Sequence, residues 1–193
     1  STLLASSAAS DVYKRQSKSR AGGVLYSDYS LGRFFAEPAR QPWFENTIFL
    51  VTADHCASSA GRTEIPLQKY HIPALILAPG LIEPGVVDGI VSQIDLMPTL
   101  LSLLNMSYDS HFYGRSIFDP AYVNRAFIAT YQDLGYLEGD TFTILSPVRR
   151  FEQYRVVPTE ENPHHLEAME RKDAVQVDRA IGYYQTSCKW NKR

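Results

Sequence analysis

The sequence has few cysteines, no long apolar run and no excess of charge of one sign. Two cysteines among 193 residues, Cys56 and Cys188, are too few for a disulfide framework and match no zinc-binding spacing. The longest apolar stretches, such as Ile72 to Pro79, are far shorter than the roughly 18 to 20 residues that cross a bilayer. Lysine and arginine number 19 against 21 aspartate and glutamate, which argues against a general nucleic-acid binder with a basic face.

What remains is an ordinary globular composition with an unusual first segment. Hydrophobic residues make up 45% of the chain and charged residues 21%, in a length sufficient for one domain. Residues 1–20 show neither helical nor strand periodicity, and their basic residues follow the weakly apolar part, unlike a signal peptide. The stretch from Ser6 to Gln16 resembles a translated sequencing-adapter tail, with a genuine disordered tail or linker as the alternative. We therefore predict that residues 1–20 are non-native or disordered and take no part in chemistry.

The rest of the chain alternates between strand and helix patterns. The spacing of apolar residues predicts helices over 24–36 and 95–104, and a long C-terminal helix that begins at Asn162 and Pro163. Residues 48–53 form a continuous apolar run, which is typical of a strand buried on both faces. Further strands are predicted at 70–78, 125–130, 141–145 and 154–157, the last two as a hairpin. This alternation predicts a layered α/β domain.

Asp54 and His55 follow directly after the apolar run 48–53. Ligand sites of open α/β sheets collect at the carboxyl ends of strands, where side chains of neighbouring residues can converge. A carboxylate oxygen beside an imidazole nitrogen suits Zn²⁺ or Mn²⁺ better than Ca²⁺. The alternative is a strand-end aspartate that caps a loop and a histidine satisfied by a backbone carbonyl. Two protein ligands do not complete a catalytic metal site, because such a site typically needs three or four protein ligands.

Several segments together resemble the C-terminal half of a known catalytic domain. They resemble the sulfatase-like domain of the alkaline phosphatase superfamily, and particularly the phosphoglycerol transferases similar to lipoteichoic acid synthase. The matching segments are NTIFLVTADHCASSAG (46–61), YHIPALILAPG (70–80), VSQIDLMPTLLSLLN (91–105), YGRSIF (113–118) and the preceding helix with YSDYSLGRFF (26–35). The resemblance implies that residues 21–193 are the C-terminal part of a three-layer α/β/α domain with a mostly parallel central sheet.

The resemblance also implies roles for single residues. In that family the Asp-His pair ligates the catalytic divalent cation, so Asp54 and His55 become the expected metal ligands, with Mn²⁺ or Zn²⁺ as first choices and Mg²⁺ or Ca²⁺ as further ones. The family nucleophile lies upstream of the first matching segment, beside another carboxylate ligand. We therefore expect this chain alone to be inactive.

The loop after the Asp-His pair offers two further candidates. Cys56 adjoins His55, but adjacent residues do not easily form a nucleophile–base hydrogen bond of about 3 Å, so we expect a packed thiol. Arg62 is a candidate substrate-binding residue, because its guanidinium can contact an anionic oxygen; a solvated loop arginine is the alternative.

Three other polar positions have structural interpretations. We interpret His71 as a hydrogen-bonded structural histidine and Asp95 as the N-cap of the helix 95–104. His164 and His165, in the first turn of the expected C-terminal helix, are interpreted as a solvent-exposed pair.

Three functions are compatible with these residues. The first is a metal-dependent phosphoglycerol-type transferase that acts on a cell-envelope lipid or glycan. The resemblance would then imply a membrane protein, anchored by upstream helices, whose catalytic domain faces the periplasm or the cell exterior. The second is a sulfuric ester hydrolase of the same superfamily, and the third is a non-catalytic α/β fragment.

Overall fold

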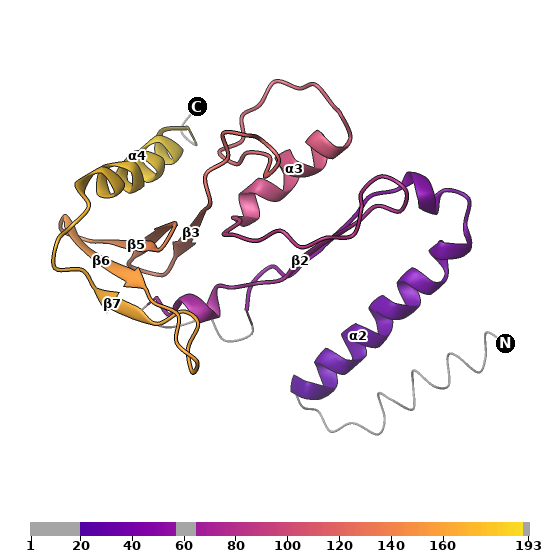
Figure 1. Cartoon of the computed structure of the whole chain (residues 1–193), viewed down its shortest axis with the longest axis horizontal. Coiled ribbons are helices and arrows are strands. Elements are labelled where there is room, and N and C mark those ends of the chain that lie inside the picture. The colour runs from indigo at the N-terminus through magenta and orange to yellow at the C-terminus, as the bar shows by residue number, and fades with distance from the viewer. Residues whose placement is uncertain (1–19, 57–64, 191–193) are drawn as a thin grey trace. The chain divides into compact units, whose positions relative to one another are not determined.

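The computed structural model describes residues 20–56 and 65–190 (Figure 1). Two compact units make up the chain: residues 1–49 with 76–83, and residues 50–75 with 84–193. The predicted tail, residues 1–20, lies outside the described residues except for Arg20, so its nature stays a prediction. Within the described ranges, no helix combines the length and the apolar character needed to span a membrane.

The first unit is built on helix α2 (Arg20–Ala36), which confirms the helix predicted over 24–36. It ends before Pro38, which opens a short 3-10 turn because proline is tolerated only in a first turn. The ring of Phe49 packs against three other phenylalanine rings of this unit, at centroid distances of 5.3 to 6.2 Å. These rings are Phe34, Phe35 and Phe44.

Two predicted strands are confirmed with shorter bounds. Strand β1 (Phe49–Thr52) and strand β2 (Ala74–Leu77) form a two-stranded sheet. Pro73, which lacks an N–H, stands just before β2. Burial on both faces of β1 is not found, since Phe49 to Val51 are half-buried and Thr52 is exposed.

The second unit contains a five-stranded sheet in the order β3–β4–β5–β6–β7. Each strand is antiparallel to its neighbour, so the parallel pairing expected of the central sheet is not found among these five strands. The predicted hairpin is confirmed, with Thr141 opposite Arg155 and Ser146 opposite Arg150. The strands are β3 (Arg125–Ala129), β4 (Leu134–Glu138), β5 (Thr141–Ser146), β6 (Arg150–Val156) and β7 (Leu166–Ala168).

Helix α4 (Ala174–Trp190) lies against one face of this sheet, over β4 and β5 (Figure 1). Val177 and Ala180, three residues apart on the helix, are buried, and the ring of Tyr183 on the same helix meets the ring of Tyr136 of β4 at a centroid distance of 5.7 Å. The hydroxyl of Tyr184 lies 2.8 Å from the carbonyl oxygen of Gly135 and 3.1 Å from that of Ile128. These contacts fix the helix on the sheet.

The predicted start of the C-terminal helix at Asn162 is wrong. Residues 166–168 form the edge strand β7, and the helix begins only at Ala174. Val157 donates its N–H to the carbonyl of His165 at 2.9 Å, and Met169 donates to Gln153 at 3.0 Å. The open edge of β6 thus gains backbone partners that a helix at this position would leave unpaired.

Candidate metal centre

Asp54 and His55 stand at the end of β1, and their side chains point to a common position. The N–H of His55 donates to Oδ1 of Asp54 at 2.8 Å, and Nε2 of His55 lies 3.5 Å from Oδ2 of Asp54. Both side chains are open to solvent, with 88% of Asp54 and 69% of His55 exposed. A ligand can therefore reach both donor atoms.

The ring orientation of His55 suits a metal ligand. Its Nδ1 lies 2.9 Å from the carbonyl oxygen of Cys56, an acceptor that requires the proton on Nδ1. The lone pair is then on Nε2, the nitrogen that faces Asp54. Two ligands at about 2.1 Å from one tetrahedral ion are separated by about 3.4 Å. The 3.5 Å between Nε2 and Oδ2 therefore fits one divalent cation bound by both residues.

The pair does not form a complete site by itself. Among residues 20–56 and 65–190, no group of three or more His, Cys, Asp or Glu side chains is placed to hold a metal ion. A catalytic cation of this type needs at least one more protein ligand. Within the described part of the chain, the structure thus supplies two ligands and an open side.

The turn that carries Asp54 and His55 is fastened to the segment before β2. The hydroxyl of Thr52 donates to the carbonyl of Pro73 at 3.0 Å, and the N–H of Ala53 approaches the same oxygen at 3.4 Å. The thiol of Cys56 donates to the carbonyl of His71 at 3.2 Å. Backbone carbonyls of two residues therefore hold the turn from one side.

The other candidates of this loop have different outcomes. The thiol of Cys56 contacts the backbone of His71 and its carbonyl orients His55, which is the packing role expected for this residue. Arg62 lies outside the described residues, so its role in substrate binding stays a prediction.

Two of the remaining histidines form a contact that the sequence does not indicate. The rings of His71 and His164 meet edge to face with centroids 5.3 Å apart. Burial and the neighbouring His71 lower the pKa of His164 below its ordinary value. The expected exposure of both residues of the pair 164–165 is therefore wrong for His164, which is half-buried, and right for His165.

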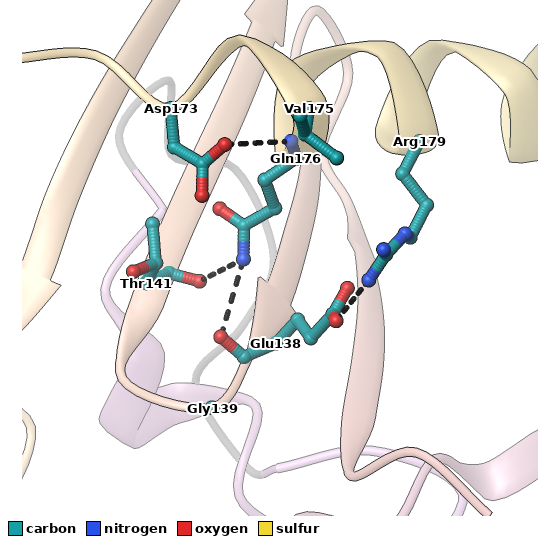
Figure 2. A pocket seen from close by; sticks show the side chains of 7 residues that line it. All are labelled: Glu138, Gly139, Thr141, Asp173, Val175, Gln176 and Arg179. Carbon is teal, nitrogen blue, oxygen red and sulfur yellow. Dashed lines mark hydrogen bonds and ion pairs between the residues drawn. The ribbon is translucent and has the colours of Figure 1, made fainter. Parts of the chain in front are cut away.

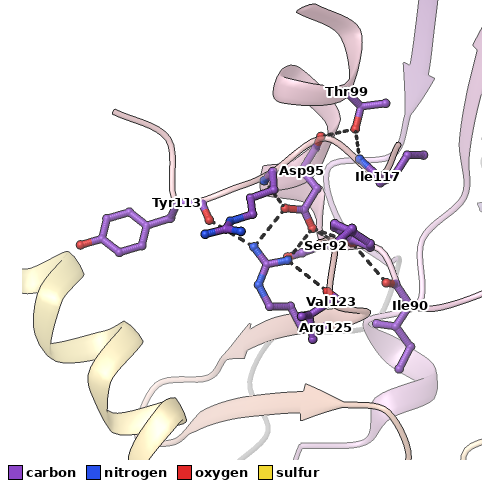
Figure 3. A network of polar contacts seen from close by, with 10 residues as sticks. Ile90, Ser92, Asp95, Thr99, Tyr113, Ile117, Val123 and Arg125 are labelled. Atoms are coloured by element: carbon purple, nitrogen blue, oxygen red, sulfur yellow. Dashed lines mark hydrogen bonds and ion pairs between the residues drawn. The ribbon is translucent and has the colours of Figure 1, made fainter. Parts of the chain in front are cut away.

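Asp95 has a larger role than the predicted helix cap. It occupies the N-cap position of α3 (Leu96–Leu103), but its carboxylate does not cap that helix. The side chain is fully buried, and its carboxylate accepts hydrogen bonds from both terminal nitrogens of Arg125 at 3.2 Å (Figure 3). It also accepts hydrogen bonds from the hydroxyl of Tyr122 at 2.9 Å and from the backbone N–H groups of Ser92 and Arg115. Sequence reasoning missed this network, although an arginine that opens the apolar strand 125–129 is a signal for a buried partner.

The network shifts the ionisation of its members. Although burial disfavours charge, the Asp95 carboxylate keeps the pKa of Arg125 above its ordinary value. Burial and the hydrogen bond to Asp95 raise the pKa of Tyr122. Arg125 also donates to the carbonyl of Tyr113 at 3.1 Å, so that the network joins the segment at 113–117 to the start of β3.

A pocket of about 320 Å³ lies away from these residues, between the β4–β5 turn and the start of α4 (Figure 2). The side-chain amide of Gln176 donates to the carbonyls of Glu138 and Thr141 at 3.1 and 3.2 Å, and Arg179 pairs with the carboxylate of Glu138. Asp173 accepts the N–H of Gln176 at 3.1 Å. Because these polar groups already bind one another, we interpret them as structural contacts that fasten α4 to the β4–β5 turn.

Comparisons with known proteins identify the family of the chain. The family profile described as Sulfatase matches residues 5–106, just over half of the chain. An arylsulfatase of Clostridium perfringens is 30% identical over 115 residues, which cover 55% of this chain and 24% of that protein. The chain thus spans about a quarter of the length of this relative.

A solved structure extends the likeness to most of the chain. The structure, a protein of the alkaline phosphatase superfamily from Vibrio parahaemolyticus, is 31% identical and superposes with a TM-score of 0.77. The match covers 90% of this chain and 43% of the other. It confirms the predicted α/β fold of the alkaline phosphatase superfamily. The chain belongs to the sulfatase family.

Proposed function

We propose that the whole protein carrying this chain is a metal-dependent enzyme that cleaves or transfers a sulfate or phosphate ester, with Asp54 and His55 as two ligands of its cation. The observation that carries the proposal is the geometry at the end of β1. Nε2 of His55 and Oδ2 of Asp54 are 3.5 Å apart, open to solvent, and belong to a chain of the sulfatase family.

The chain's own residues prepare the site before any cation arrives. The carbonyl of Cys56 holds the proton of His55 on Nδ1 and keeps the Nε2 lone pair free. Asp54 contributes a negative charge next to this lone pair, and its Oδ1 accepts the N–H of His55, which orients the carboxylate. When bound, a divalent cation such as Mn²⁺ or Zn²⁺ neutralises charge on sulfuryl or phosphoryl oxygens and activates a nucleophile.

Two substrate classes are compatible with this site. The arylsulfatase relative favours hydrolysis of a sulfate ester. The segments at 46–61 and 91–105, which resemble the phosphoglycerol transferases, favour transfer of a phospho-group to a cell-envelope lipid or glycan. In the second case we also propose a membrane-anchored protein with its catalytic domain outside the cytoplasm, a proposal that rests on the resemblance alone.

The test compares two double variants of the whole protein. Asp54→Ala/His55→Ala should abolish cation-dependent turnover of p-nitrophenyl sulfate or of a phosphodiester such as phosphatidylglycerol, whichever is the substrate. Asp109→Ala/His111→Ala removes the same two residue types from an exposed loop and should keep full turnover. Turnover retained in the first variant would refute the assignment. The substrate that is consumed distinguishes hydrolase from transferase.

The isolated chain provides a second check. Because its described residues hold two ligands and no complete metal cluster, we expect it to bind Mn²⁺ and Zn²⁺ weakly and to turn over neither ester. Robust turnover by these 193 residues alone would contradict the idea that further ligands and the nucleophile come from elsewhere.

A further inference from the structure

A side chain outside the metal pair contacts the peptide unit that carries Asp54. The amide nitrogen of Gln93 donates to the carbonyl oxygen of Ala53 at 3.2 Å, across 40 residues of sequence. This carbonyl and the N–H of Asp54 belong to the same planar peptide unit. A rotation of that plane would therefore move the Asp54 backbone and, with it, the carboxylate.

Hydrogen bonds hold the peptides on both sides of Ala53. The N–H of Ala53 approaches the carbonyl of Pro73 at 3.4 Å, and the neighbouring Thr52 hydroxyl donates to the same oxygen at 3.0 Å. Gln93 contacts the carbonyl at the other end of the residue. The Thr52 hydroxyl also lies 3.3 Å from the Ala53 carbonyl oxygen, but it belongs to the preceding residue, so Gln93 provides the contact that ties this carbonyl to a distant segment of the chain.

Gln93 itself stands on a firmly held support. It opens the 3-10 turn η4 (Gln93–Asp95), between the buried residues Ser92 and Asp95. The N–H of Ser92 donates to the Asp95 carboxylate at 3.2 Å, and that carboxylate is paired with Arg125, whose side chain is 3% exposed. The buried ion pair therefore fixes the backbone from which the Gln93 side chain reaches the turn that carries Asp54 and His55.

We propose that Gln93 is a positioning residue for Asp54: it holds the peptide plane before Asp54 so that the carboxylate faces Nε2 of His55. The inference rests on the proposed function, since it assigns Gln93 a role toward the cation held by that pair. Gln93 touches neither donor atom in this role and acts only through the Ala53 carbonyl. Loss of an outer partner of this kind typically costs 10- to 100-fold in metal affinity.

The test is Gln93→Leu in the whole protein, a change that keeps the side-chain size and removes the donor. We expect the affinity for Mn²⁺, measured by calorimetry, to fall by about 10- to 100-fold. The urea midpoint of unfolding should stay unchanged, because Gln93 is exposed. The visible absorption of bound Co²⁺ should also change as the ligand geometry loosens. The matched control is Gln132→Leu, at another exposed glutamine, which should alter none of these quantities.

A second variant keeps the proposal testable if Gln93→Leu fails to fold. Gln93→Asn retains the amide but is one methylene too short to reach the Ala53 carbonyl, so it should show the same loss of affinity. Unchanged Mn²⁺ affinity in Gln93→Leu, or in Gln93→Asn if the first variant does not fold, overturns the inference about Gln93. If Asp54→Ala/His55→Ala also leaves the Mn²⁺ affinity unchanged, the proposed function itself has failed. The two failures are thus distinguishable.

Discussion

The buried pair of Asp95 and Arg125 provides a stability test whose size follows from the structure. Arg125→Met removes a guanidinium that donates to both carboxylate oxygens at 3.2 Å, while Asp95 remains completely buried. Breaking such a pair by removing one partner costs about 3–5 kcal/mol, because an uncompensated charge is left in the interior. At about 1.4 kcal/mol per tenfold change, the folding equilibrium constant should fall by roughly two to four orders of magnitude.

The assay is urea unfolding of the chain, with a surface pair as matched control. Arg155 and Asp140 are 2.6 Å apart, but their side chains are 52% and 55% exposed. Arg155→Met should therefore cost no more than about 1 kcal/mol. A cost below about 1 kcal/mol for Arg125→Met as well would refute the reasoning.

A second substitution tests the cause of the loss. Asp95→Asn should destabilise the otherwise unchanged chain, since it removes the charge that compensates Arg125. In the Arg125→Met background, the same change should cost less, because it also removes the unpaired buried charge. An equal destabilisation in both backgrounds would contradict the electrostatic explanation.

Three further predictions concern single positions of the second unit. Gly114→Ala should lower the free energy of unfolding by about 1–3 kcal/mol or more, since the added Cβ would lie 2.0 Å from the Ile94 carbonyl oxygen. The control Gly182→Ala, at a position of α4 where a Cβ meets no other atom, should raise it by about 0.5–1 kcal/mol. Equal effects of the two variants in urea unfolding would contradict this prediction. Tyr184→Phe removes a hydroxyl that is bound to two carbonyls and should lower the free energy of unfolding by about 1 kcal/mol. Burial raises the pKa of Tyr184 to about 12, so the stability of the unchanged chain should fall as pH rises from 10 to 12. The same pH profile in Tyr184→Phe would contradict this prediction. Because the pKa of His164 is lowered in the folded chain, the unfolded chain binds this proton more readily, and stability should fall as pH drops below about 6.5. His164→Gln should flatten this pH dependence. A pH profile with the same slope in the variant would exclude His164 as the cause.

Local patterns were sufficient where the apolar periodicity was clear. The helix at 24–36, the apolar strand at 48–53 and the hairpin at 141–157 follow from residues close together in the sequence. Strand β4 was missed because Gly135 interrupts its pattern. This glycine leaves room for a side chain of the neighbouring strand β5, since a Cβ there would lie 2.8 Å from the Phe142 ring.

Non-local partners explain the remaining differences. Asn162 and Pro163 are typical of a helix start, but the unpaired edge of β6 draws the following residues into β7. A sequence alone also does not show that Asp95 meets an arginine 30 residues further along the chain. Asp54 and His55 could be proposed as metal ligands because both residues are adjacent, follow a strand and lie in segments that resemble a known family. Gln93 could not be proposed as a positioning residue, since its partner is a backbone carbonyl 40 residues away.

The most direct test of the metal centre is anomalous diffraction from crystals of the whole protein soaked with Zn²⁺. We expect one peak about 2.0–2.2 Å from both Nε2 of His55 and the carboxylate of Asp54. A peak that involves Nδ1 of His55, or that lies away from both residues, would contradict it.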